Sequence, residues 1–183
     1  MKDVDEEANL ILCSHDHRDH GAVEVVNLVN PEAECPWRIA EIASFHDDVH
    51  GEARGNNTIR ILDNGNRIIH YGDIGMDIDE LLTEENLELL KGADVALVPI
   101  GGFYTIDAGQ ALDLIGRTQP KLVIPMHYRS ADPVFGYDVI SDISEFIPMA
   151  EAAGYTVKTW GSEYDTAEGG SDASILVMRP AAL

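Results

Sequence analysis

A short stretch rich in histidine and aspartate near the N-terminus restricts what this chain can be. Residues 9–14, with the sequence Asn-Leu-Ile-Leu-Cys-Ser, are typical of a buried strand that ends in a polar residue. Six polar residues follow directly: His15-Asp16-His17-Arg18-Asp19-His20. Because side chains two residues apart point the same way at a strand end, His15 and His17 can bind one metal ion. Asp19 and His20 are placed to reach a second ion beside it. Imidazole and carboxylate groups suit zinc, iron and manganese, so we interpret this stretch as a metal site rather than an ordinary charged loop.

Three more candidate ligands follow apolar segments further along the chain. His46 comes after residues 42–45, Asp73 comes after residues 67–71, and His127 comes after residues 123–126. Loops at strand ends collect functional residues in layered folds. A single histidine or aspartate at such a place is more often a turn or capping residue. Together with the first stretch, however, these three residues complete the ligand sets of two ions.

The length and composition indicate one globular domain, which we assign to residues 1–183. The chain has 45% hydrophobic and 25% charged residues, as globular domains of this size do. Two cysteines, Cys13 and Cys35, are too few for a disulfide scaffold. No apolar run is long enough to cross a membrane, and the first six residues do not resemble a signal peptide. We therefore expect a cytoplasmic protein.

The charge balance limits the classes of partner. Twelve Lys and Arg against 33 Asp and Glu give a net charge of −21. A surface this acidic repels nucleic-acid backbones and anionic lipids, so we expect neither a nucleic acid nor a membrane as partner. A small anionic substrate remains compatible, because a bound metal can reverse the local field. The acidity also suits a cytoplasm of high salt, although solubility alone explains it.

Apolar periodicity and turn residues predict strands and helices in alternation. Residues 58–62 and 67–71 flank an Asp-Asn-Gly-Asn turn, which is a strong hairpin signal. The predicted strands are residues 9–14, 37–45, 58–62, 67–71, 93–100, 121–126, 155–160 and 174–178. The predicted helices are residues 21–29, 77–90, 107–117 and 138–153. The fold class is therefore α/β with layered packing, and the hairpin makes the sheets at least partly antiparallel.

In these segments the sequence resembles the metallo-β-lactamase superfamily, and in particular its small metal-dependent hydrolases similar to the ascorbate-6-phosphate lactonases. Five segments carry the resemblance in the same order: residues 14–20, 45–47, 70–75, 94–102 and 124–128. The resemblance implies a mixed α/β fold, the αββα sandwich, with a site for two divalent ions at one edge. Zinc is the first expectation for the metal, with manganese or iron also accepted by this ligand set.

The resemblance also implies a role for each candidate ligand. His15, His17 and His46 would hold the first ion. Asp19, His20 and His127 would hold the second ion, and Asp73 would bridge the two. Asp19 and Asp73 are the expected catalytic residues.

The chain departs from the family pattern at its N-terminus. Family members normally begin with several further strands, including an aspartate that supports the metal site, whereas here the first metal motif starts at residue 15. An N-terminally shortened sandwich would leave a sheet edge and part of the core exposed. Because a second subunit could cover this region, we expect a homo-oligomer. Weakened stability or activity is the other expected consequence.

The expected reaction is hydrolysis. Two divalent ions about 3.5–4 Å apart share a water and lower its pKa towards 7, which produces a hydroxide at neutral pH. That metal-bound hydroxide would attack an ester, lactone or phosphodiester bond of a small-molecule substrate. Asp19 would orient it and could pass a proton to the leaving group. The sequence shows no Ser/His/Asp or Cys/His nucleophile pattern that would replace it.

Three alternatives to this hydrolase stay open. Nucleases share the scaffold, but they rely on basic surfaces or extra domains that this acidic chain lacks. Di-iron oxidoreductases share it too, although as a family they carry glutamate at the position of His17. The third alternative is a non-catalytic protein of the same fold that binds metal or a partner.

Several other residues allow both a functional and an ordinary structural interpretation. We expect His50 to be a solvent-exposed loop residue and Cys13 to be a buried free thiol. His70 could hydrogen-bond near the metal site or serve as an ordinary cross-strand residue. Candidates for contact with substrate are Arg18, Arg129 and Tyr104, each of which could equally be structural.

Overall fold

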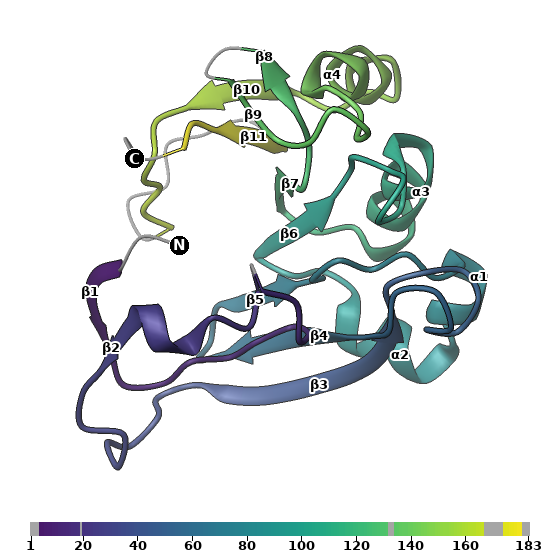
Figure 1. The fold of residues 1–183 in the computed structure, drawn as a ribbon. Coiled ribbons are helices and arrows are strands. Elements are labelled where there is room, and N and C mark those ends of the chain that lie inside the picture. The colour runs from purple at the N-terminus through teal and green to yellow at the C-terminus, as the bar shows by residue number, and fades with distance from the viewer. Residues whose placement is uncertain (1–3, 19, 132–133, 167–173, 181–183) are drawn as a thin grey trace.

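The structure is a computed structural model, and it describes residues 4–18, 20–131, 134–166 and 174–180. Its centre is a seven-stranded mixed sheet in the order β10-β11-β7-β6-β5-β4-β3 (Figure 1). The strands of this sheet are β3 (Arg38–Phe45), β4 (Asn56–Asp63), β5 (Arg67–His70), β6 (Val95–Pro99), β7 (Leu122–Met126), β10 (Val157–Trp160) and β11 (Ile175–Met178). Two short pairs complete the strands: β1 (Val4–Ala8) with β2 (Val26–Leu28), and β8 (Ser130–Ala131) with β9 (Val134–Phe135).

Within the large sheet, β4 runs opposite to the six other strands. Strands β5, β6, β7, β11 and β10 pair in parallel, whereas β3–β4 and β4–β5 pair antiparallel. The predicted hairpin is confirmed, because Asp63 pairs with Arg67 across the Asn-Gly turn. The α/β class is confirmed as well. Of the two sheets that the resemblance implies, the described residues form one large sheet.

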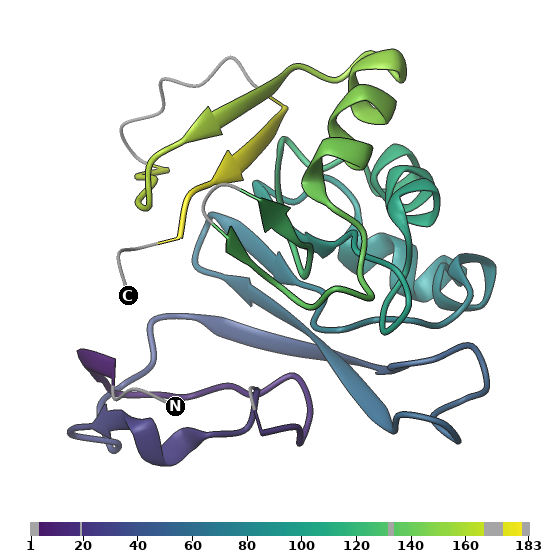
Figure 2. The same ribbon diagram turned by 45° about the horizontal axis from the view of Figure 1, so that its top comes forward.

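Four α-helices lie along one side of this sheet (Figures 1 and 2): α1 (Ile78–Leu81), α2 (Glu84–Leu90), α3 (Ala108–Thr118) and α4 (Ile143–Ala152). Each begins at a polar residue whose side chain accepts a hydrogen bond from the first turn, namely Asp77, Thr83, Asp107 and Asp142. The single helix predicted over residues 77–90 is wrong, since α1 ends at Leu81 and Thr83 caps the start of α2. The last helix starts at Ile143 rather than residue 138.

Strand alternation divides the core into two clusters. In β6, Ala96 and Val98 face the larger cluster, to which the helices contribute Leu114 and Phe146. Val95 faces a smaller cluster on the opposite side of the sheet, formed with Leu122 and Leu176. Partly buried side chains complete the smaller cluster: Ile68, Leu97, Ile124, Trp160, Tyr164 and Met178. The helices therefore supply most of the burial on one face only.

The N-terminal segment differs from the predicted structure. Residues 9–14 were expected to form a buried strand, but they are an irregular segment beside β4, and only Ser14 among them is buried. The Thr58 N–H donates to the Ser14 carbonyl (2.8 Å), and the Arg60 guanidinium donates to the Cys13 carbonyl. The segment therefore follows the sheet without joining its ladder. The helix predicted over residues 21–29 is a 3₁₀ turn, Val23–Val25, followed by β2.

None of the helices in the described ranges has the length and apolar composition that a bilayer crossing requires.

Candidate metal centre

The candidate ligands gather at one edge of the large sheet. Strands β3, β5 and β7 run in the same direction, so their C-terminal ends meet at this edge. His46 directly follows β3, Asp73 lies three residues after β5, and His127 directly follows β7. The histidine-rich stretch reaches the same edge because Ser14 is hydrogen-bonded to Thr58 near the start of β4. Side chains from four distant parts of the sequence therefore converge.

The Asp73 carboxylate is the centre of this cluster. Four imidazole Nε2 atoms surround its Oδ2 atom: His46 at 3.2 Å, His127 at 3.3 Å, His20 at 3.4 Å and His15 at 3.8 Å. Only 5% of the Asp73 side chain is exposed, whereas 25% of the His20 side chain is exposed. The cluster is thus buried on the Asp73 side and open on the His20 side.

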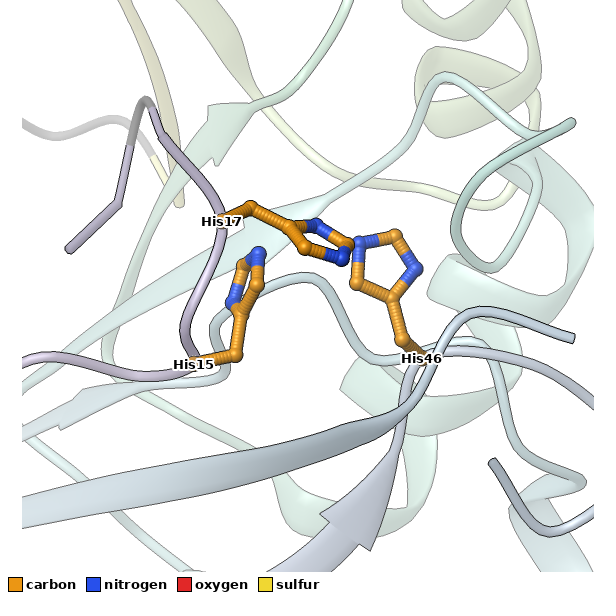
Figure 3. Close-up of side chains that lie close together, drawn as sticks. All are labelled: His15, His17 and His46. Carbon is orange, nitrogen blue, oxygen red and sulfur yellow. The ribbon is translucent and has the colours of Figure 1, made fainter. Parts of the chain in front are cut away.

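Two sets of three side chains have ligand atoms within 4.8 Å of one another: His15 with His17 and His46, and His15 with His20 and Asp73. Figure 3 shows the three imidazole rings of the first set turned toward one another, two from the N-terminal stretch and His46 from the end of β3. The His15 ring lies 4.6 Å from the His17 ring and 4.9 Å from the His46 ring, measured between centroids. Sets of this size can hold an ion.

The structure brings together six of the seven predicted ligands, the exception being Asp19, which lies outside the described residues. The first set equals the group expected to hold the first ion. The second set contains His15 besides the expected His20 and Asp73, so His15 belongs to both candidate ion sites. His127 approaches the cluster through Asp73.

The nitrogen and oxygen atoms of this cluster are better placed to bind a cation than to hydrogen-bond with one another. His15 Nε2, His46 Nδ1 and Asp73 Oδ1 are buried, and none of the three has a hydrogen-bond partner among the described residues. A buried polar atom without a partner is costly, and native proteins rarely leave several together. Imidazole nitrogens and carboxylate oxygens are also ordinary ligands of zinc, manganese and iron. A bound divalent ion would supply the missing partner.

The charges of the cluster keep its groups in forms that bind metal. Burial alone would raise the pKa of Asp73, but hydrogen bonds from His127 and His46 and the charges of His127 and His20 outweigh it, so the pKa is lowered well below its usual value. Burial, followed by repulsion from His20, lowers the pKa of His15 to about 4. At neutral pH the carboxylate is therefore ionised and the His15 imidazole is neutral, as metal ligation requires.

Neighbouring polar groups fix the orientation of two imidazoles. The Ser14 hydroxyl lies 3.0 Å from His15 Nδ1, which leaves His15 Nε2 directed at Asp73. The Gly72 N–H donates to His70 Nδ1 (3.0 Å), so His70 braces the loop that carries Asp73. Burial, together with repulsion from His20, lowers the pKa of His70. His70 thus lies behind the cluster.

A buried asparagine, which the sequence analysis missed, ties the Asp73 loop to the sheet. The Asn57 side chain donates to Ser44 Oγ (2.9 Å) and to the Tyr71 carbonyl (2.9 Å). Its Oδ1 accepts from the Asp73 N–H at 3.1 Å. The sequence does contain a signal for the burial of Asn57. In a strand, this residue lies on the same face as Ile59 and Ile61, which are buried, so its side chain faces the core.

Asp47, the neighbour of His46, organises the loop that follows β3. Its Oδ1 accepts from the N–H groups of Val49 (3.0 Å) and Gly51 (2.8 Å). Its Oδ2 accepts from the N–H groups of Ala53 (3.1 Å) and Arg54 (2.6 Å). The side chain is 2% exposed, and these backbone hydrogen bonds outweigh the effect of burial and lower its pKa. No role had been expected for Asp47.

Close backbone packing fixes the position of His127. This residue has a φ of 52°, in the left-handed region that residues with a Cβ rarely adopt. Its carbonyl oxygen lies against Gly101, two residues after β6, where a Cβ would overlap it. Gly101 therefore allows the β6 and β7 loops to approach each other, and this approach holds His127 beside Asp73.

A pocket of about 430 Å³ opens over the cluster. Its lining combines cluster residues with neighbouring side chains: His17, His46, Asp73, His127, Ala53, Arg54, Tyr104 and Tyr137. Tyr104 therefore lies where contact with a substrate was anticipated.

Other residues considered in the sequence analysis lie away from this pocket. Arg18 and Arg129 do not line it, and His50 is exposed and pairs with Glu80. Cys13 is a free thiol of intermediate exposure rather than a buried one.

The sequence model of the beta-lactamase superfamily domain matches residues 1–127. The chain belongs to this superfamily. Its matched region contains the cluster from His15 to His127, so the family resemblance and the convergence of these side chains concern the same residues.

Curated relatives of this superfamily member are named metal-dependent hydrolases. A protein of this name from Hyperthermus butylicus is 28% identical over all of this chain and 83% of its own length. Another from Carboxydothermus hydrogenoformans is 29% identical over 82% of this chain and 78% of its own length.

Solved structures show the same fold. A metallo-β-lactamase superfamily protein from Thermotoga maritima has a TM-score of 0.64 and 23% identity, covering 90% of this chain and 78% of its own. A metallo hydrolase from Ignicoccus hospitalis has a TM-score of 0.53 and 29% identity, covering 80% of this chain and 52% of its own.

Proposed function

We propose that this chain is a metal-dependent hydrolase that cleaves an ester, lactone or phosphodiester bond of a small molecule. The observation that supports this most directly is the cluster around Asp73. Four imidazoles surround one carboxylate oxygen there, and three buried ligand atoms lack partners among the described residues. The names of the relatives support the same class of reaction.

We propose two divalent ions as the cofactor, zinc first and manganese or iron as alternatives. When bound, such ions activate water and polarise the oxygen of the scissile bond. His15, His17 and His46 would hold one ion. His20 and His127, with Asp19, would hold the other, and Asp73 would contact both.

The chain itself supplies the shape of the site. Asp73, ionised at neutral pH, offers a fixed negative charge at the floor of the pocket. The pocket volume of about 430 Å³ suits a small molecule rather than a polymer. Tyr104 and Tyr137 line the same pocket, where a substrate would lie. We propose that Asp19 passes the proton to the leaving group.

Chelation tests this proposal. The protein is purified, its metal content is measured by elemental analysis, and turnover is followed with a panel of esters, lactones and phosphodiesters. Treatment with a chelator should abolish turnover of at least one substrate, and zinc or manganese should restore it. Hydrolysis that survives removal of all metal would contradict the proposal.

Two other outcomes would select an alternative. Bound metal without turnover of any substrate in the panel favours a non-catalytic binding protein on the same fold. Bound iron with consumption of oxygen favours a di-iron oxidoreductase. The cytoplasmic location and the homo-oligomer stay predictions, which cell fractionation and analytical ultracentrifugation would test.

A further inference from the structure

Arg54 is the cationic side chain of the pocket. It lies in the loop between β3 and β4, and it is the one Arg or Lys among the described residues that line the cavity. Its side chain is half-buried rather than extended into solvent. The chain has a net charge of −21, so most of its surface repels anions. A positive side chain in the pocket therefore favours an anionic ligand there.

Two aromatic rings hold the Arg54 guanidinium. Its Cζ atom lies 5.4 Å from the centroid of the Phe103 ring and 5.2 Å from that of the Tyr104 ring. Stacking of this kind is favourable for arginine and leaves the edge of the planar guanidinium free to donate hydrogen bonds. The rings therefore restrict the side chain without neutralising it.

Acidic side chains do not neutralise Arg54 either. Arg38, Arg60 and Arg117 each form an ion pair with an aspartate or glutamate. Within the described part of the chain, Arg54 forms none, despite the large excess of carboxylates. Its charge is therefore available to a ligand.

The backbone of Arg54 is fixed relative to the metal cluster. Its N–H donates to Asp47 Oδ2 at 2.6 Å, and Asp47 is the residue next to His46. On the other side, the Tyr104 ring that contacts Arg54 lies 6.4 Å from the His127 ring. Two connections thus hold the guanidinium at one wall of the pocket while the ligand cluster forms its floor.

We infer that Arg54 determines substrate specificity by binding an anionic group, a carboxylate or a phosphate, on the small molecule whose bond is cleaved at the cluster. This inference rests on the proposed hydrolase function and narrows its substrate class. The guanidinium donates paired hydrogen bonds to the anionic group, and the reacting bond lies over the Asp73 side of the pocket. A purely structural Arg54, joining two loops through its rings, is the competing explanation.

Paired ester substrates distinguish the two explanations. The value of kcat/KM is measured for 4-nitrophenyl acetate, which is neutral, and for the mono-4-nitrophenyl ester of succinate, which carries a free carboxylate. We expect the protein to favour the anionic ester and Arg54→Gln to lower the ratio of the two values at least tenfold. Arg54→Lys should lower the ratio less, because the charge remains while the planar donor pair is lost.

Arg38→Gln is the matched control. It makes the same change of net charge at a side chain that is 84% exposed and does not line this pocket. Its ratio should equal that of the unaltered protein. If Arg54→Gln and Arg54→Lys lower both kcat/KM values by the same factor, or lower neither, the inference is wrong and the hydrolase proposal stands.

A binding measurement keeps the inference testable if neither ester is hydrolysed, an outcome that bears on the proposed function alone. Inorganic phosphate is titrated by calorimetry into the folded, chelator-treated protein, so that metal does not contribute to binding. Phosphate should bind the unaltered chain and Arg38→Gln alike, and Arg54→Gln should weaken binding at least tenfold. Equal affinity in all three proteins, or no binding to any, would overturn the inference.

Discussion

Individual buried polar residues hold the candidate metal ligands in place. Asn57 is 1% exposed, and its side-chain hydrogen bonds join β3, β4 and the loop that carries Asp73. Asp47 does the same for the loop after His46. Neither residue belongs to the set of expected ligands, yet each determines where a ligand lies. Groups of this kind behind a metal site commonly affect it as strongly as the ligands do.

Asn57→Ala should therefore weaken both the fold and the site. The Asp73 N–H and the Tyr71 carbonyl would lose their buried partner, so we expect unfolding to become easier by about 2–4 kcal/mol. Metal affinity should fall about 10–100-fold because Asp73 loses its support. Chemical denaturation and metal titration measure the two effects. Asn66→Ala, at an exposed turn residue, is the control, and equal results for both variants would contradict this role.

Gly101→Ala tests the close approach that positions His127. A methyl group there would overlap the His127 carbonyl, and the neighbouring Ile140 side chain leaves little room for it to move away. We expect loss of at least about tenfold in metal affinity, with a stability loss of about 1–3 kcal/mol from overpacking.

Gly116→Ala, on α3, is the matched control because its nearest heavy atom, Tyr155 Oη, lies 3.8 Å from the new methyl group. That variant should be as stable as the unaltered protein or slightly more so, since alanine favours a helix. A thermal melt and a metal titration of both variants provide the comparison. Unchanged metal binding in Gly101→Ala would show that the β7 loop is free to shift.

At the scale of elements, the parallel strands are joined at both ends. Their C-terminal ends carry the cluster, and their N-terminal ends meet at Asp94. This carboxylate accepts from the Arg67 N–H (2.7 Å), at the start of β5, and from Lys121 Nζ (2.6 Å), just before β7. One side chain therefore holds the starts of three strands together, on the edge of the sheet away from the candidate metal centre.

The Asp94 contacts predict a pH dependence of stability. The Lys121 ammonium and the Arg67 N–H lower the pKa of Asp94 below its unfolded value near 3.9. A lowered pKa stabilises the fold above the unfolded pKa, and this contribution disappears as pH falls through the folded pKa. Asp94→Asn should thus be less stable by about 1 kcal/mol at pH 7, and the difference should shrink below about pH 4.

Urea denaturation at a series of pH values measures this difference. Asp113→Asn is the control for the change of charge, because within the described ranges Asp113 makes only an exposed pair with Arg117 four residues on. A difference between Asp94→Asn and the unaltered protein that stays constant from pH 7 to pH 3 would show that Asp94 acts through packing instead.

At the scale of the whole molecule, the sheet separates two unequal faces. Among the described residues, the helix-covered face contains most of the buried side chains, whereas the opposite face has three buried apolar residues, Val95, Leu122 and Leu176. The net charge of −21 is spread over this small body. Burial on one face must therefore offset repulsion among many carboxylates.

Salt should consequently stabilise the protein. Raising NaCl from about 10 mM to about 1 M shortens the screening length from about 30 Å to about 3 Å and removes most of the repulsion between surface carboxylates. We expect the Tm, measured with a chelator present, to rise steadily over this range. KCl should have the same effect at equal ionic strength. A Tm that is flat or falls would show that the charge does not limit stability.

Local sequence was sufficient to predict the elements that are marked by a turn or a capping residue. The Asn-Gly turn identified the hairpin, and polar caps such as Asp107 identified helix starts, because these interactions involve neighbouring residues. The same locality explains the errors. Residues 9–14 have the composition of a strand, but a strand forms only where a ladder partner is available. The apolar spacing of residues 77–90 continues across Thr83, but Thr83 caps a second helix there.

The sequence by itself determined the types and order of the candidate ligands, and the family, because these depend on residue identity and spacing. Tertiary structure alone decided that Asp73 lies at the centre of four imidazoles, because that depends on strand directions and on the contact between Gly101 and His127. It also decided the place of Arg54, whose significance comes from contact with the rings of Phe103 and Tyr104, which are distant in sequence. Residue identity and spacing determine which chemical groups are present, whereas tertiary packing determines the distances between them.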